Sequence, residues 1–245
     1  MRVTILGTGG GVPSKTRETS CVLVRDSDCA LLLDVGTGAR RLFSHANLLE
    51  GVARVDVVLT HFHFDHICGL PYLEWLGIET MIWAPGAWLY NMASGNILAP
   101  LRRPPISPND VSDVRVHELR EGPQTIHGFT VRASAQPHHW APSVGLRIDD
   151  DLAYITDTPY ETSSAELARD VRHLLHEAWS ASSEPKSADT DATATDAARV
   201  AREADVGDLT LIHLNPNLSD YAELIQDAWP AFDRVTVGED EMVLI

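Results

Sequence analysis

The stretch His61-Phe62-His63-Phe64-Asp65-His66 decides the fold, and it directly follows the apolar run Val55-Asp56-Val57-Val58-Leu59-Thr60. Three imidazoles and one carboxylate within six positions are too many polar groups for a structural loop, because each must be paired if it turns inward. A metal is the obvious group to gather them. His-x-His after a strand directs alternate side chains to one side, while Asp65 and His66 diverge as the chain turns toward a helix. This geometry suits two neighbouring metal ions.

Length and composition favour one domain spanning residues 1–245. The 44% hydrophobic content supplies a substantial core, and no stretch approaches the ~18 apolar residues that span a bilayer. We therefore expect no membrane segment. The N-terminus has no pattern of the secretory type, so the expected location is cytoplasmic.

The charge balance bears on the substrate. The net charge is −16, from 19 basic and 35 acidic residues, and it opposes long-range attraction to a phosphate backbone. A small-molecule substrate is therefore favoured over a nucleic-acid polymer.

Short strands alternate with helices along the whole chain, which indicates an α/β architecture. A probable helix near 38–50 follows the first strands, and 86–112 is helical and then irregular because of its prolines. A Ser/Ala/Thr/Asp-rich loop, 180–194, interrupts the later part. The strands are expected at 2–6, 20–25, 29–34, 54–60, 80–84, 114–119, 129–136, 143–149, 151–156, 173–177 and 209–212, with two more at the end, and further helices near 70–76, 162–171, 195–205 and 219–229.

Further candidate ligands stand at the ends of later strands, where loops on one edge of a sheet converge. They are His138 or His139, Asp157 and His213. Any one alone is more typical of a hydrogen-bonded structural residue, but together behind the His61–His66 stretch they indicate a metal site.

Two segments are expected to border that site. The run Gly7-Thr8-Gly9-Gly10-Gly11-Val12-Pro13 lacks the Lys-Ser/Thr ending of a phosphate loop, so we interpret it as a tight, close-packed loop. Asp34 ends a strand where its carboxylate could fix metal-binding imidazoles.

The pattern of His61, His63, Asp65 and His66, followed by His139, Asp157 and His213, resembles the metallo-β-lactamase-fold superfamily over nearly the whole chain. The glycine run, Asp34-Val35-Gly36-Thr37-Gly38 and His176-Glu177-Ala178 are similar to the ribonuclease Z branch and related phosphodiesterases. The resemblance implies a four-layer αββα sandwich with a dinuclear site on the shared edge of its two sheets, and a homodimer.

The resemblance also implies a ligand set. His61, His63 and His139 would hold one zinc ion, Asp65, His66 and His213 the other, and Asp157 would bridge them. His139 is preferred to His138 because Gly145 lies six residues on, as in the family's pattern. His138 is then expected beside the site or at its rim, with an ordinary surface role as the alternative. Two Zn²⁺ are the expected cofactors, with Mn²⁺ or Fe²⁺ as alternatives.

A metal-bridged hydroxide would attack the substrate, so the expected activity is a dinuclear-zinc hydrolase of small or nucleotide-derived phosphodiesters. The catalytic candidates are Asp65, Glu177 and Asp191. Asp191 stands where ribonuclease Z has a proton-donating histidine, and Glu177 could orient the donor.

Three alternatives stay open. A ribonuclease Z that processes the 3′ end of transfer RNA is one, although no long inserted basic arm is evident. A lactone or thioester hydrolase on the same fold is the second, because the same hydroxide can attack a carbonyl. The third is a non-enzymatic, metal-stabilised binding protein.

Overall fold

The computed structural model describes residues 1–107, 114–138, 141–181, 190–218 and 220–244. Within these ranges, no helix is both long enough and apolar enough to cross a membrane.

The first sheet is built mainly from the N-terminal half of the chain, in the order β14-β1-β2-β3-β4-β5-β6. Antiparallel pairing joins β14, β1, β2 and β3, and parallel pairing joins β3, β4, β5 and β6. Its strands are β1 (Arg2–Gly7), β2 (Cys21–Asp26), β3 (Cys29–Leu33), β4 (Arg54–Val58), β5 (Glu79–Ala84), β6 (Arg115–Glu118) and β14 (Val243–Leu244).

The second sheet has the order β13-β12-β11-β10-β9-β8-β7. Antiparallel pairing runs from β7 to β10, and parallel pairing from β10 to β13. Its strands are β7 (Gly122–Ile126), β8 (Phe129–Gln136), β9 (Ser143–Ile148), β10 (Leu152–Ile155), β11 (His173–Glu177), β12 (Asp208–Ile212) and β13 (Val235–Val237).

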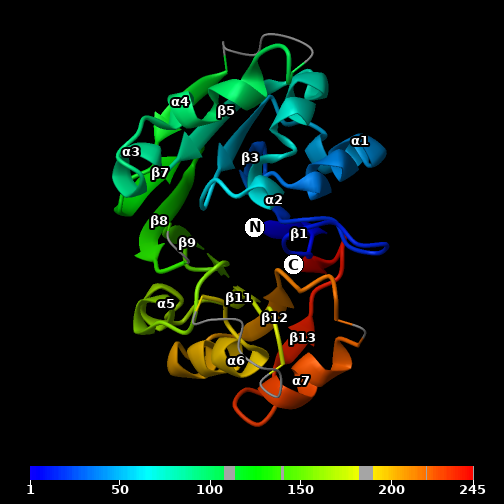
Figure 1. The fold of residues 1–245 in the computed structure, drawn as a ribbon, viewed down its shortest axis with the longest axis vertical. Coiled ribbons are helices and arrows are strands. Elements are labelled where there is room, and N and C mark those ends of the chain that lie inside the picture. Colours follow the sequence, from blue (N-terminus) through cyan, green and yellow to red (C-terminus); the bar gives the residue numbers. More distant parts are fainter. Residues whose placement is uncertain (108–113, 139–140, 182–189, 219, 245) are drawn as a thin grey trace.

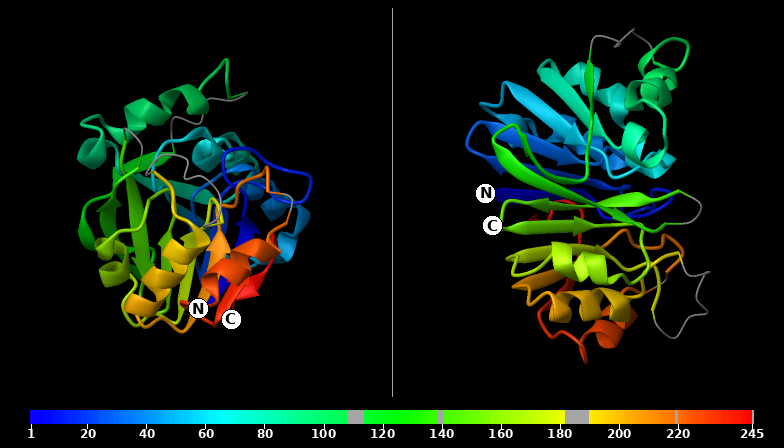
Figure 2. Two further views of the ribbon diagram at one scale, coloured as in Figure 1. Left: turned by 60° about the horizontal axis from the view of Figure 1, so that its bottom comes forward. Right: turned by 90° about the vertical axis from the view of Figure 1, so that its left-hand side faces the viewer.

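The two sheets pack face to face, and helices cover the outer face of each (Figures 1 and 2). A core of apolar side chains from both sheets, such as Val24, Leu31, Val131 and Leu146, fills the space between them. The first sheet is covered by α1 (Arg41–Ser44), α2 (Phe64–Ile67), α4 (Ser94–Leu98) and the 3₁₀ turns η1 (Thr37–Arg40), η2 (Ala46–Leu49), η3 (Leu70–Leu76) and η4 (Ala99–Arg102). Helix α3 (Gly86–Leu89) packs Trp88 and Leu89 against the core between the sheets. The second is covered by α5 (Thr162–Leu167), α6 (Ala194–Glu203) and α7 (Ala222–Ala228). The predicted four-layer αββα sandwich is confirmed.

Two element predictions were wrong. The helix expected near 38–50 is broken into η1, α1 and η2, because the chain leaves helical geometry at His45 (φ −130°, ψ 76°). No strand was expected at 122–126, where β7 forms the edge of the second sheet; an edge strand is a place where a proline such as Pro123 is tolerated. Residues 108–113 and most of the predicted 180–194 loop lie outside the described ranges.

Candidate metal centre

Chemistry-bearing residues follow the carboxyl ends of strands from both sheets. His61 and His63 come after β4 in the first sheet, and Asp65 and His66 lie in α2. From the second sheet, Asp157 follows β10 and His213 follows β12. Because β10, β11 and β12 run parallel, their ends meet at one edge, as the sequence predicted.

A first ligand group consists of His61, His63, His138 and Asp157, whose ligand atoms all lie within 4.8 Å of one another. His138 Nε2 lies 3.3 Å from His63 Nδ1 and 3.4 Å from Asp157 Oδ1. His61 Nε2 lies 3.7 Å from the same Asp157 oxygen. Three imidazoles and a carboxylate therefore converge on one point.

A second ligand group consists of Asp65, His66 and His213, again within 4.8 Å. Asp65 Oδ2 lies 3.3 Å from His66 Nε2 and 3.3 Å from His213 Nε2. The two imidazole Nε2 atoms are themselves 3.3 Å apart.

Asp157 stands between the two groups with one carboxylate oxygen toward each. Its Oδ1 faces His61 and His138. Its Oδ2 lies 3.1 Å from His66 Nε2 and 3.4 Å from His213 Nε2. This is the arrangement that a bridging carboxylate requires.

The structure corrects the placement of His138. From the sequence, this residue was expected beside the site, at its rim or on the surface, but its side chain is buried within the first ligand group. His139, preferred on its spacing to Gly145, lies outside the described residues. Strand β8 buries Phe129, Val131 and Ala133, but this alternation breaks at 134–135, and beyond the break Gln136 and His138 are the buried residues. Alternation along the strand therefore gives no sequence signal for His138.

Asp34 holds His66 from outside the ligand groups, as predicted. Its Oδ2 accepts from His66 Nδ1 at 2.8 Å and from the Tyr154 hydroxyl at 2.9 Å. Its Oδ1 accepts from the Thr60 backbone N–H at 2.8 Å. A carboxylate on the distal nitrogen fixes the orientation of a metal-binding imidazole.

Glu177 has a comparable place beside His213. Its Oε1 accepts from the backbone N–H groups of Thr158 at 2.6 Å and Ala192 at 3.2 Å. Its Oε2 lies 3.4 Å from His213 Nδ1. Glu177 thereby ties the loop that carries Asp157 to the strand that delivers His213.

Asp191 lies at the edge of the first ligand group. Its Oδ1 is 4.0 Å from His138 Nδ1, and 12% of its side chain is exposed. Its Oδ2 accepts from the Thr190 hydroxyl at 2.9 Å.

The glycine run borders the second ligand group, which confirms that expectation. The Gly11 N–H donates to Asp65 Oδ2 at 2.8 Å. A Cβ added at Gly10 would lie 2.6 Å from His213 Cε1, so only glycine lets the backbone pass this close to the imidazole.

Charges inside the site are strongly coupled. Burial and the positive charge of His66 lower the pKa of His61 well below its ordinary value. Against the effect of burial, the carboxylate of Asp157 raises the pKa of His213 to about 10. Burial works against ionisation of Asp157 as well, but His213 and His66 hold its pKa well below the usual range. Burial raises the pKa of Glu177 to about 7.

Three residues of the site have left-handed backbone conformations. The φ angles are +57° at Asp34, +55° at Asp157 and +48° at His213. Non-glycine residues in this region store strain and gather at functional sites.

The donor set suits divalent metal ions. The buried Nε2 of His61 has no hydrogen-bond partner within the described part of the chain, and the lowered pKa leaves its lone pair free to bind a cation. Imidazole nitrogens combined with carboxylates suit zinc, iron and manganese. The three cysteines are free thiols, and neither ligand group contains one.

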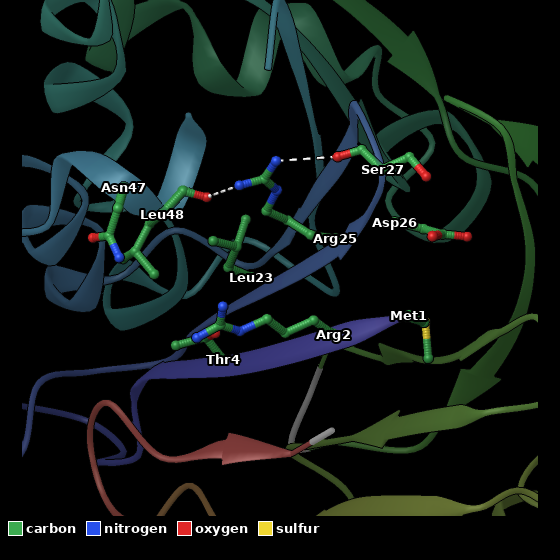
Figure 3. Close-up of a pocket in the computed structure, with 9 residues that line it drawn as sticks. All are labelled: Met1, Arg2, Thr4, Leu23, Arg25, Asp26, Ser27, Asn47 and Leu48. Carbon is green, nitrogen blue, oxygen red and sulfur yellow. Dashed lines mark hydrogen bonds between the residues drawn. The ribbon is translucent and has the colours of Figure 1, made fainter. Parts of the chain in front are cut away.

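A separate pocket of about 360 Å³ lies between β1, β2 and η2 (Figure 3). Within it, the Arg25 guanidinium donates to the carbonyls of Leu48 at 2.8 Å and Ser27 at 3.1 Å. No residue of the two ligand groups lines this pocket. Arg25 therefore clamps backbone segments together there, away from the metal centre.

Comparison with known proteins places this geometry in context. A family model described as a beta-lactamase superfamily domain matches residues 30–214. Ribonuclease Z from Haloarcula marismortui is 28% identical, over 99% of this chain and 96% of that protein. That match extends over 313 residues, more than the 245 of this chain, so the relative has additional residues without a counterpart here.

Solved structures agree on the fold. The metallo-beta-lactamase fold protein YhfI from Bacillus subtilis superposes with a TM-score of 0.82 at 22% identity, covering 99% of this chain and 98% of that one. The short form of human tRNase Z gives a TM-score of 0.73 at 21% identity, covering 100% and 99%.

Proposed function

This chain belongs to the beta-lactamase superfamily and is a metal-dependent hydrolase, and we propose that it cleaves phosphodiester bonds with two divalent cations, one in each ligand group. Zinc is the leading choice for both positions, with manganese or iron as alternatives, because imidazole nitrogens dominate the donors. The ligands would be His61, His63 and His138 for one ion and Asp65, His66 and His213 for the other, with Asp157 shared.

The position of Asp157 carries this proposal. Its two oxygens face different ligand groups, which suits a pair of ions better than a single one. Two such ions would supply an activated water and stabilise negative charge on the attacked phosphoryl group.

The surrounding residues would hold the ligands in place. Asp34 accepts the Nδ1 proton of His66 and so directs Nε2 into the site. We assign Glu177 the same role toward His213, because Oε1 is taken up by two backbone N–H groups while Oε2 faces the imidazole.

Asp191 remains the candidate proton donor to the leaving group. Glu177, expected to orient the donor, is fully buried, whereas the Asp191 side chain retains some exposure beside His138. A donor must reach the leaving oxygen, and this position at the edge of the ligand group meets that need.

Two substrate classes are compatible with such a site. The relatives favour processing of the 3′ end of transfer RNA over a small-molecule substrate, because similarity to ribonuclease Z covers nearly the whole chain. The net charge of −16 favours the second class, a small phosphodiester.

A parallel assay separates the two classes. Purified zinc-loaded protein is given a precursor transfer RNA with a 3′ trailer, bis(p-nitrophenyl) phosphate, and a panel of lactones and thioesters. We expect hydrolysis of at least one phosphodiester, abolished in His61→Ala. Turnover of lactones or thioesters with both phosphodiesters intact would refute the proposal.

We also propose a homodimer, on the resemblance to ribonuclease Z. Light scattering coupled to size-exclusion chromatography should give twice the chain mass of 26.9 kDa.

A further inference from the structure

Trp179 forms a wall beside the second ligand group. It follows strand β11 by two residues, and its backbone N–H donates to the Ala192 carbonyl at 2.9 Å. Its indole ring lies 5.6 Å from the His213 ring, centroid to centroid, with the planes tilted by 33°. The side chain is only partly buried.

Gly11 of the glycine run faces this indole without a side chain. A Cβ added at Gly11 would lie 3.6 Å from Trp179 Cη2, so a side chain there would extend over the ring. The φ of +69° at Gly11 disfavours such a side chain. The same glycine donates its N–H to Asp65, which fixes the bare loop at the edge of the ligand group. Within the described residues, a partly exposed indole therefore lies next to a proposed metal ligand.

The chemistry of this surface is distinct from that of the ligand groups. Histidines and carboxylates can hold metal ions, and those ions can bind a phosphate. These side chains provide no extended apolar face for an organic group attached to that phosphate. An indole offers such a face, and flat nucleobases stack on it whatever their sequence.

We propose that Trp179 stacks against a nucleobase attached to the scissile phosphodiester, so that the site selects nucleotide-derived diesters, either free or at an RNA end. This inference rests on the proposed phosphodiesterase function. Trp179 acts as a specificity-determining residue that contacts the substrate beyond the reacting atoms.

Two substrates with one leaving group test it: thymidine 5′-(p-nitrophenyl) phosphate and methyl p-nitrophenyl phosphate. In the unaltered protein kcat/KM should be higher for the thymidine ester. Trp179→Leu keeps apolar bulk without a π face and should lower that preference by about 5- to 150-fold, mainly through KM. Trp179→Phe should retain most of it. Trp229→Leu, at an exposed tryptophan that caps the C-terminus of α7, is the matched control and should change the hydrolysis of neither substrate.

The outcomes separate the inference from its premise. If neither ester is hydrolysed and precursor transfer RNA is also intact, the phosphodiesterase proposal fails. If the esters are hydrolysed but Trp179→Leu affects both equally, or neither, stacking of the nucleobase is contradicted while the phosphodiesterase stands.

Two further measurements ask whether the nucleobase belongs to an RNA end and what to do if the variant does not fold. Loss of precursor transfer RNA cleavage in Trp179→Leu, with methyl ester hydrolysis retained, would assign the nucleobase to an RNA end. If Trp179→Leu does not fold, inhibition of ester hydrolysis by the unaltered protein tests the inference instead. Thymidine 5′-monophosphate should inhibit at lower concentration than methyl phosphate. Equal inhibition by the two compounds would overturn the inference.

Discussion

At the scale of single residues, the sequence identified most of the groups that converge and missed how the backbone presents them. The sequence predicted a metal site from one crowded stretch, because so many neighbouring polar groups need a common partner; its members are His61, His63, Asp65 and His66. The left-handed backbone at Asp157 and His213 was not readable, since neither is a residue type that signals it as glycine would.

The sequence favoured His139 as the metal ligand, whereas the structure places His138 in the first ligand group. We expect His138→Ala to lower kcat by about 100-fold or more and to release the ion of the first ligand group, because one of its three imidazoles is lost. His139→Ala is the neighbouring control. Metal content and kcat measured on both variants decide between them, and a larger loss in His139→Ala would restore the original assignment.

Asp34 should act on metal affinity from outside the ligand groups. Asp34→Asn removes the negative acceptor of His66 Nδ1, and asparagine tolerates the φ of +57°. We expect zinc affinity to fall about 10- to 100-fold, measured by competition with a chelator. Tyr154→Phe, which removes only a neutral donor to Asp34, should change the affinity less. Unchanged affinity in Asp34→Asn would mean that His66 needs no such support.

At the scale of elements, prediction worked best where burial and alternation are strong. The inner strands of both sheets were expected close to their observed bounds, because apolar residues fill most of their buried positions, as in β3 and β12. The edge strand β7 and the broken segment from Thr37 to Leu49 were not, since pairing and packing with distant residues decide their conformation.

The glycine run should be sensitive to a single methyl group. Gly10→Ala would place Cβ 2.6 Å from the His213 ring, so we expect a folded protein with a displaced His213 and an impaired second ligand group. Gly95→Ala, in α4 with nothing within 4 Å of the added Cβ, is the matched control and should be neutral or slightly stabilising. Circular dichroism, metal content and activity check both; normal metal content in Gly10→Ala would show that the loop can move aside.

At the scale of the whole molecule, the two sheets bring distant parts of the sequence to one edge. The first sheet supplies the His61–His66 stretch and Asp34, and the second supplies Asp157, Glu177 and His213. The positions of the candidates at strand ends and the family pattern together predicted this convergence. Local periodicity alone could not, because it does not say which strands from distant parts of the chain pair. Whether residues 1–245 fold as one unit stays a prediction.

The net charge of −16 predicts how salt affects each substrate class. If the protein cleaves RNA without a compensating basic surface, kcat/KM for precursor transfer RNA should rise as salt increases from about 50 to 300 mM, because salt screens the repulsion. A singly charged small diester should respond little. A steep fall with salt for the RNA would instead indicate a basic docking surface.

The central claim is a two-metal centre bridged by Asp157. Diffraction at the zinc absorption edge, from crystals of zinc-loaded protein, tests it most directly. We predict two anomalous peaks per chain on opposite sides of the Asp157 carboxylate, one next to His61, His63 and His138 and the other next to Asp65, His66 and His213. A single peak, or none within coordinating distance of Asp157, would contradict the account.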